Sequence, residues 1–212
     1  VLFGGEDAIK ASEIFKENGV EILGPDYDFY RKITNKIEFF DILDYANVKH
    51  TSSKKLYVGT CIEAQVISDG ENYFVPALCE HIEKAHINSG DSISVTPTVS
   101  LSESMLETVK EYIGAVVSEL SFKGALDIQF VVFDNDLYVT KASVTNTTLV
   151  PFVTKASGVD VVDMAIRSMV GEKLTQTGIG KTKGNYYVRV PVFSFEKLKG
   201  ADMEKKKKTK ST

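Results

Sequence analysis

Apolar and polar positions at the start of the chain predict a small β-α-β unit followed by a long helix. Residues 1–3 form a short apolar run that ends at two glycines, and residues 8–15 carry apolar side chains at helical spacing. A second apolar run at 20–23 precedes a Gly-Pro pair, which is typical of a strand that ends in a turn. Helical spacing of apolar residues returns at about 30–45, so we expect one amphipathic helix there.

The periodic pattern is lost at 51–55, which is polar, and we expect a boundary between two structural units there. After it, residues 56–67 and 73–78 are apolar enough to predict two strands, which flank a turn at Asp69-Gly70. Residues 92–95 form a further short extended run.

The clearest predicted helix covers about 102–120, where apolar side chains share one face. Ser100 and Glu103 have the spacing of a capping box, which predicts the start of this helix. A last helix is expected at 161–170, with Asp160 as its N-cap.

Between these two helices, residues 126–133 and 137–140 predict a hairpin around the polar turn at 134–136. Residues 187–193 read as one more strand. The order of elements is therefore α/β at the start and α+β afterwards.

Composition narrows the class of protein only slightly. The net charge is -4, and 43% of the 212 residues are hydrophobic, which is ordinary for a globular protein and gives no indication of nucleic-acid binding. Positive charge is concentrated only at Lys205–Lys208 and Lys210, where we expect a solvated, disordered tail. No apolar run approaches the roughly 18 residues that a membrane span needs. Cys61 and Cys79 are predicted to be free thiols.

Three features of the sequence fit either a functional or a structural role. Gly4-Gly5, at the end of a strand, fits either a phosphate-binding turn or a simple tight turn. Glu80, His81 and Glu83 fit a surface ion pair better than a metal site, because a single histidine is present. Gln129 lies in an apolar strand, so its amide must face solvent, a cleft or a buried partner.

Several stretches of the chain resemble carbamoyl phosphate synthetase large subunits. Residues 80–92 are similar to the family's E-H-[IV]-E-x-A-G-[VI]-H-[ST]-G-D-[SA] motif, and 127–130 to its N-V-Q-F strand. Residues 134–139 resemble the hairpin that follows, and 151–159 resemble the P-F-V-S-K-x-x-G-V motif of the second, carbamate-phosphorylating unit. The resemblance covers nearly the whole chain except its lysine tail.

This resemblance implies a fold and a division into domains. A small Rossmann-like pre-ATP-grasp domain is expected at 1–50, an incomplete ATP-grasp domain at 56–200, and a basic tail at 201–212. Between Val48 and Leu56 the family carries several dozen residues, including the subdomain whose glycine-rich loop covers ATP. The chain is therefore expected to be a shortened ATP-grasp protein.

The resemblance also implies an activity and its partners. Members phosphorylate carbamate to carbamoyl phosphate with ATP and magnesium or manganese, in pyrimidine or arginine biosynthesis or in the urea cycle. The implied partners are ATP, other synthetase segments and a glutaminase subunit, with no nucleic acid and no membrane. The family works in the cytoplasm or in mitochondria.

Site residues follow from the same resemblance. The nucleotide-binding positions carried over are Lys36, Leu56, Ile87, Ser89 and Gln129. Gln129 also stands at the position of a metal-binding glutamine. No catalytic residue is assigned.

Other positions of the family's site have changed. Lys141 replaces the metal-binding glutamate, Ser143 replaces the asparagine, and Thr145 and Thr148 replace two arginines. Cys61, His86 and Asn88 replace further residues of the nucleotide site, and Lys36 stands in for an arginine. We expect impaired or absent catalysis, and the alternative is a non-catalytic remnant that binds a nucleotide or a synthetase partner. A decayed gene copy or an incomplete gene prediction is a third interpretation.

Overall fold

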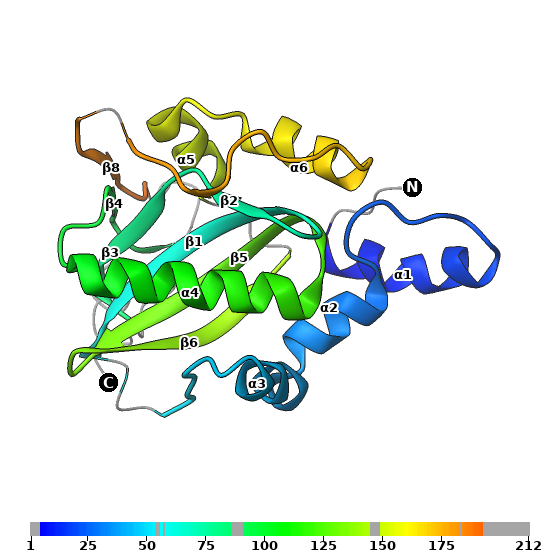
Figure 1. The fold of residues 1–212 in the computed structure, drawn as a ribbon, viewed down its shortest axis with the longest axis horizontal. Coiled ribbons are helices and arrows are strands. Elements are labelled where there is room, and N and C mark those ends of the chain that lie inside the picture. Colours follow the sequence, from blue (N-terminus) through cyan, green and yellow to red (C-terminus); the bar gives the residue numbers. More distant parts are fainter. Residues whose placement is uncertain are drawn as a thin grey trace, which may run out of the picture.

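The computed structural model describes residues 5–53, 56, 58–85, 91–144, 149–182 and 184–192. Within them, helices surround a single sheet (Figure 1). The helices are α1 (Glu6–Glu17), α2 (Tyr27–Thr34), α3 (Lys36–Tyr45), α4 (Glu103–Leu120), α5 (Val150–Ser157) and α6 (Val161–Met169). The strands are β1 (Thr60–Asp69), β2 (Tyr73–Val75), β3 (Leu78–Lys84), β4 (Ser94–Thr96), β5 (Lys123–Phe133), β6 (Asp136–Ser143), β7 (Gly178–Ile179) and β8 (Tyr187–Arg189).

The sheet has the strand order β6-β5-β1-β3-β4-β8, and β2 pairs with both β1 and β7. All neighbours in the main order are antiparallel, and β1 and β5 pair along their length, from Thr60–Val132 to Asp69–Lys123. The predicted hairpin is present as β5 and β6. Asp134 and Asn135 both adopt positive φ angles, of 52° and 60°, which is the conformation that tight hairpin turns require.

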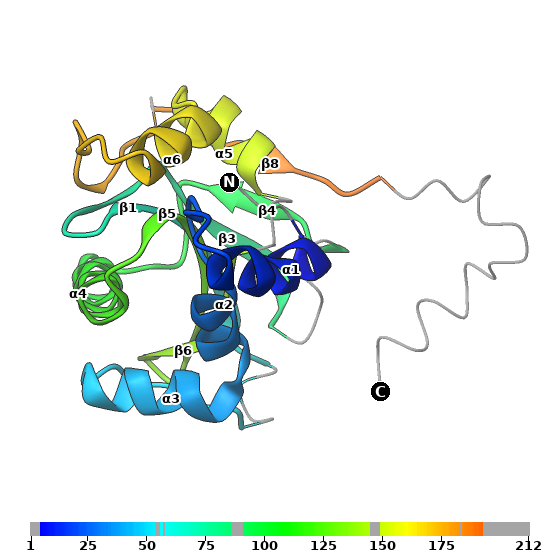
Figure 2. The same cartoon turned by 90° about the vertical axis from the view of Figure 1, so that its right-hand side faces the viewer.

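The main hydrophobic core lies between α4 and one face of the sheet (Figure 2). Ile113 and Val116 of α4 are fully buried against strand residues such as Ile62, Ala64 and Phe130. Ile62 and Ala64 are two apart in β1 and Phe130 lies opposite Ile62, so all three side chains point to the same face. Burial of this stripe fixes α4 across the sheet.

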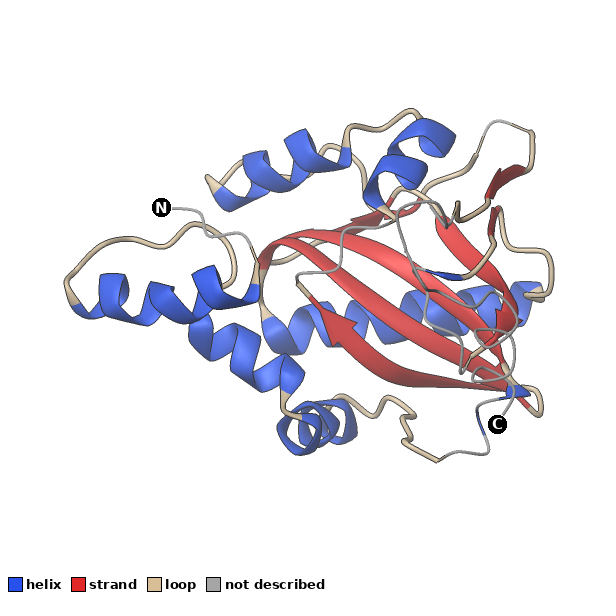
Figure 3. Cartoon of the chain, turned by 180° about the vertical axis from the view of Figure 1, so that it is seen from behind, coloured by secondary structure: helices blue, strands red, loops and turns tan. Residues whose placement is uncertain are grey.

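A second, smaller core joins α5 and α6 to the sheet. Ile67 and Cys79 of the strands pack with Val153 of α5 and Ala165 of α6. Gly124 in β5 permits the close approach of α6, because a side chain there would lie 2.4 Å from the end of Met169, and its φ of 110° also favours glycine. Seen from behind, α5 and α6 lie along one border of the sheet and α3 along the opposite border (Figure 3).

The expected helix at 30–45 is two helices. Asn35 ends α2 and begins α3, and its side chain accepts hydrogen bonds from the backbone N–H groups of Ile37 and Glu38. The helical spacing continues across this break, so the pattern alone did not reveal it. Phe39 and Leu43 of α3 belong to the main core, together with the sheet. The proposed domain boundary near 50 stays a prediction.

The predicted β-α-β unit is only partly observed. Its helix is present as α1, whereas residues 1–3 and Gly4 lie outside the described residues. The expected strand at 20–23 is wrong, because only Leu23 takes part in a β-bridge.

Several strand boundaries also differ from expectation, and β5 and β6 both extend beyond the predicted 126–133 and 137–140. The strand expected at 56–67 begins at Thr60, the run at 73–78 ends at Val75, and the extended segment at 92–95 is β4 at Ser94–Thr96. The strand expected at 187–193 is described as β8, which ends at Arg189. The helix α5 and the separate strand β3 were not expected from the pattern.

Among the residues that the structure describes, no helix combines the length and the apolar character needed to cross a bilayer. The basic tail at 201–212 lies outside the described residues.

The start of α4 differs from the sequence prediction and provides a test. Ser102 is the N-cap, since its hydroxyl accepts a hydrogen bond from the Met105 backbone N–H, whereas the predicted cap Ser100 precedes the helix. We expect Ser102→Ala to lower the free energy of unfolding by about 1 kcal/mol, the usual cost of losing an N-cap. Ser100→Ala is the matched control. Urea unfolding should show almost no loss for the control, and equal losses in both variants would contradict the assignment.

Asp69, at the turn between β1 and β2, gives a second test, which concerns pH. Its side chain accepts hydrogen bonds from the backbone N–H groups of Glu71, Asn72 and Leu174. Burial alone would raise the pKa of this carboxyl, but the three N–H donors and nearby Lys173 hold its pKa below the ordinary value. A lowered pKa in the folded state stabilises the fold above the unfolded pKa of about 4, and that contribution is lost as the pH falls further.

We therefore expect Asp69→Asn to lower the free energy of unfolding at pH 7 by about 1–2 kcal/mol, because one charged acceptor is lost. The variant should also lose less stability than the unmodified chain when the pH falls from 5 to 3. Urea unfolding at several pH values measures both effects. An unchanged acid dependence in the variant would contradict the role given to Asp69.

Candidate functional site

The face of the sheet opposite α4 carries polar side chains near its centre. Cross-strand pairing aligns them in two rows, because directly opposed residues of antiparallel strands point to the same face. One row is Glu63 of β1, Gln129 of β5 and Lys141 of β6. The other row consists of Gln65, Asp127 and Ser143. We call these six residues the polar face.

The row of Gln65, Asp127 and Ser143 is buried throughout, whereas the other row runs from a buried to an exposed residue. Glu63 and Asp127 are each only 1% exposed, and Gln65 is also buried. Gln129 is half-buried and Lys141 is exposed. The polar face therefore opens to solvent at Lys141 of β6, and none of the helices α1–α6 crosses the middle of this face (Figure 3).

A β-bulge places Lys141 opposite Gln129. The register between β5 and β6 shifts between Gln129 and Phe130, since Gln129 pairs with Lys141 but Phe130 pairs with Val139. Thr140 is the extra residue on β6, and its hydroxyl donates a hydrogen bond to the Gln129 carbonyl oxygen at 3.2 Å. The bulge turns the Lys141 side chain onto the same face as Gln129.

The Glu63 side chain also contacts His81 of the neighbouring strand β3. Its carboxylate lies 2.7 Å from Nε2 of His81, and both side chains are almost inaccessible to solvent. On the other side of the imidazole ring, the Ser94 hydroxyl lies 3.5 Å from Nδ1. The contact with His81 fixes the Glu63 carboxylate at the buried end of its row.

The expected surface pairing of Glu80, His81 and Glu83 is wrong. Glu80 and His81 are buried and point to opposite faces of β3, because successive strand residues alternate. Glu80 accepts hydrogen bonds from the backbone N–H groups of Val99 and Ser100, and Glu83 accepts from Ser92 and Ile93. Each of the three side chains has a structural partner of its own.

Comparison with known proteins identifies the family. The model of the carbamoyl-phosphate synthase L chain, ATP-binding domain, matches residues 52–177. A carbamoyl phosphate synthase large chain of Lachnoclostridium phytofermentans is 34% identical over 180 residues, which are 82% of this chain and 17% of that protein. The chain belongs to the carbamoyl-phosphate synthase ATP-binding domain family. It spans only about a sixth of the length of this relative.

Solved structures confirm the ATP-grasp fold. Urea carboxylase of Kluyveromyces lactis superposes with a TM-score of 0.70 at 16% identity, over 88% of this chain and 16% of that protein. The biotin carboxylase domain of a single-chain bacterial carboxylase gives a TM-score of 0.67 at 14% identity, over 82% of this chain and 51% of that one. The mixed α/β and α+β class predicted from the sequence is thus confirmed as a partial ATP-grasp domain.

The family implies a magnesium ion, and the described residues do not fit one. Magnesium prefers several hard oxygen ligands in octahedral geometry. Gln129 offers one amide oxygen, but the residue opposite it is Lys141, whose ammonium cannot act as a ligand and repels a cation. In the described ranges, no group of three or more His, Cys, Asp or Glu side chains is placed to hold a metal.

The structure describes three of the five predicted nucleotide-binding residues, and they lie in three different elements or connections: Lys36 on α3, Leu56 before β1 and Gln129 in β5. Leu56 is buried before β1, next to Gly59, which packs closely against Val131 and Val132 of β5. Lys36 lies on α3, where its ammonium is 5.5 Å from the centre of the Phe40 ring, and no described contact joins it to the polar face. Ile87 and Ser89 lie outside the described residues, as do Thr145, Thr148, His86 and Asn88. The assignment of these residues to a nucleotide site stays a prediction.

Cys61 and Cys79 are free thiols, as predicted from the sequence, and both are buried. Burial raises the pKa of both thiols, and the charge of Glu63 raises it further. Both thiols therefore remain protonated at neutral pH and are poor nucleophiles.

Sequence reasoning missed Glu63, Gln65 and Asp127 as members of the polar face. Glu63 and Gln65 alternate with Ile62, Ala64 and Val66 in an otherwise apolar strand, which is the same pattern that singled out Gln129. That pattern could have identified them.

Proposed function

We propose that this chain is a carbamoyl phosphate synthetase-like ATP-grasp domain that binds ATP on the polar face without a divalent cation. We further propose that it does not phosphorylate carbamate on its own. The observation that carries this proposal is the pairing of Lys141 with Gln129, at the position where the family is expected to hold its metal-binding glutamate.

Lys141 supports nucleotide binding through its charge. Its side chain is exposed and stands at the open end of the row that contains Glu63 and Gln129. An ammonium group binds phosphate as a point charge, and it would offset the buried carboxylates Glu63 and Asp127 on the same face. Lys141 would then supply part of the positive charge that a metal ion supplies in an active synthetase.

The same substitution argues against phosphoryl transfer. In active enzymes of this kind, metal ions would supply the positive charge that neutralises the phosphoryl group during its transfer. The single ammonium group of Lys141, on a flexible side chain, cannot hold the phosphates in a fixed geometry. The side chains around Gln129 do not form a set of metal ligands. Positioning and charge stabilisation, which provide most of the rate enhancement, would both be weakened.

The connection between α3 and β1 supports the same conclusion. The resemblance places several dozen residues between Val48 and Leu56, including the subdomain that covers ATP. Here residues 49–55 bridge these positions, which is too short for such a subdomain. A nucleotide on the polar face would lack that cover against water, which favours binding over phosphoryl transfer.

Phosphate release tests the absence of catalysis. With ATP, magnesium and either bicarbonate or carbamate, we expect the chain to release phosphate no faster than its Gln129→Ala variant. Competition with a fluorescent ATP analogue tests the binding, and Lys141→Ala should weaken it by about tenfold through the loss of one phosphate contact. Release above the Gln129→Ala level would contradict the proposal, as would unchanged binding by Lys141→Ala.

As a segment of a longer protein, the chain would work beside other synthetase segments or a glutaminase subunit, in the cytoplasm or in mitochondria. These are proposals, because the chain spans a small part of its relative.

A further inference from the structure

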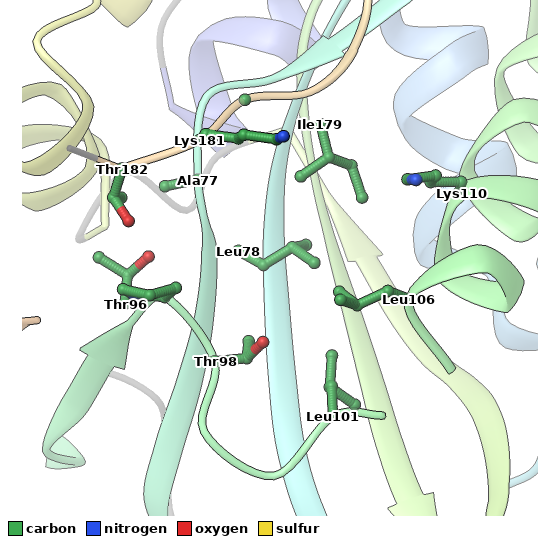
Figure 4. A pocket seen from close by; sticks show the side chains of 12 residues that line it. Ala77, Leu78, Thr96, Thr98, Leu101, Leu106, Lys110, Ile179, Lys181 and Thr182 are labelled. Carbon is green, nitrogen blue, oxygen red and sulfur yellow. The ribbon is translucent and has the colours of Figure 1, made fainter. Parts of the chain in front are cut away.

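A cleft of about 390 Å³ lies on the α4 side of the sheet. Its walls are the first half of α4, the connection at 97–101 and residues 179–182, with Leu78 of β3 between them (Figure 4). Leu78 pairs with Ala64 of the main core, whereas the next residue, Cys79, pairs with Glu63 of the polar face. Because successive strand residues point to opposite faces, this cleft and the polar face lie on opposite sides of the sheet.

Hydrogen bonds hold the walls of the cleft in place. The buried carboxylate of Glu80 accepts from the backbone N–H groups of Val99 and Ser100, at 2.7 and 2.8 Å, and so anchors the 97–101 connection. On the other wall, the Gly180 N–H donates to the Val75 carbonyl oxygen at 2.8 Å. The cleft is therefore largely formed before a ligand arrives, as is usual for small-molecule sites.

The lining combines an apolar surface with two cations. Three leucines and one isoleucine line the cleft, and Lys110 and Lys181 reach toward each other from opposite walls (Figure 4). None of the described residues that line the cleft is acidic. Lys110 pairs with Glu107 at 2.6 Å, but this pair is exposed and therefore weak. The two ammonium groups thus favour an anion at this end of the cleft.

A buried hydroxyl supplies a second, independent indication of a ligand. The side chain of Thr96 is fully buried, and its oxygen has no hydrogen-bond partner within the described structure. The hydroxyls of Thr96 and Thr182 face each other across the cleft (Figure 4). Buried polar groups are nearly always hydrogen-bonded, so a bound molecule that reaches Thr96 would satisfy a group that the protein itself does not.

We propose that this cleft binds a small organic anion, a carboxylate with an apolar body. The carboxylate would lie between Lys110 and Lys181, and the apolar body would lie on the leucine and isoleucine side chains. A polar group at the far end of the body would bond to the Thr96 hydroxyl, and a simple carboxylate tests the first two contacts alone. This site is separate from the proposed nucleotide site and goes beyond the proposed function.

Binding of hexanoate to the full chain tests the proposal, with hexanamide as the uncharged probe of similar shape. Methyl NMR shifts of Leu101, Leu106 and Ile179 report occupancy of the cleft. We expect hexanoate to bind about tenfold more tightly than hexanamide, with about a threefold loss in Lys181→Met or Lys110→Met and about tenfold in the double variant. Lys10→Met is the matched control, because Lys10 pairs with Glu6 on α1 as Lys110 pairs with Glu107.

Equal binding of the two probes would overturn the proposal, because the lysines would then not recognise charge. Unchanged hexanoate affinity in the double variant would also overturn it, as would the absence of shifts at the three methyl-bearing residues. These variants change lysines that are exposed or only partly buried, so a failure to fold is not expected to obscure the result. The control variant should bind hexanoate as the unmodified chain does.

Discussion

Glu63→Leu is expected to lower the free energy of unfolding by about 3–5 kcal/mol, because it leaves His81 buried without its partner. The two side chains meet at 2.7 Å, and each is at most 2% exposed. His81→Leu should cost a similar amount, because the Glu63 carboxylate would then be buried without the imidazole. Urea unfolding monitored by circular dichroism measures both losses.

The double variant and a conservative variant make this prediction specific. Replacing both partners removes the uncompensated polar group, so Glu63→Leu with His81→Leu should lose less stability than either single change. Glu63→Gln keeps a hydrogen-bond acceptor and should lose less than Glu63→Leu. If the losses of the two single variants simply add in the double variant, the pair does not stabilise the polar face in the way described.

Lys141→Glu combined with Ser143→Asn is expected to make ATP binding depend on magnesium. The change restores two oxygen ligands beside Gln129 and changes the local charge by two units. Two unit charges 4 Å apart near a protein surface interact by about 4 kcal/mol, so replacing repulsion by attraction is a large effect for a divalent ion. We expect magnesium to strengthen ATP binding by about a hundredfold in this variant.

Without magnesium, the same variant should bind ATP more weakly than the unmodified chain, because the new carboxylate repels the phosphates. Lys32→Glu is the control, since it makes the same charge change on the exposed surface of α2. Calorimetric titration of all three proteins with and without magnesium measures the effect. If the control gains the same dependence, or the double variant gains none, Lys141 does not occupy the position of a metal ligand.

Local signals predicted several elements well. The α4 helix was expected at 102–120, and the hairpin turn was expected at 134–136, because helical spacing and turn residues act over short distances. The cap of α4 was misplaced by two residues. The Ser100 N–H is bonded to the buried Glu80 carboxylate, so Ser100 stays in the connection and Ser102 begins the helix.

Elements that depend on distant partners could not be predicted in the same way. The strand β3 contains Glu80 and His81, whose polar side chains suggest an exposed segment, yet both are buried. Their partners, Val99 and Glu63, are 19 and 18 residues away in the sequence. Such contacts appear only when the sheet is assembled.

The candidate site also combines features that a local pattern indicates with features that depend on distant parts of the chain. Gln129 was recognisable because an amide in an apolar strand requires an explanation. Its pairing with Lys141 depends on the bulge at Thr140, which no local pattern indicates. The resemblance supplied the expected roles of these residues, and the strand register supplied their arrangement on one face.

Titration of the unmodified chain with ATP, once with EDTA and once with excess magnesium, tests the central claim most directly. The claim is that Lys141 takes the place of a metal ligand in an ATP-grasp domain that still binds ATP. We predict binding in both titrations, with dissociation constants that agree within about threefold. Binding at least tenfold tighter with magnesium, or no binding in either titration, would contradict the account.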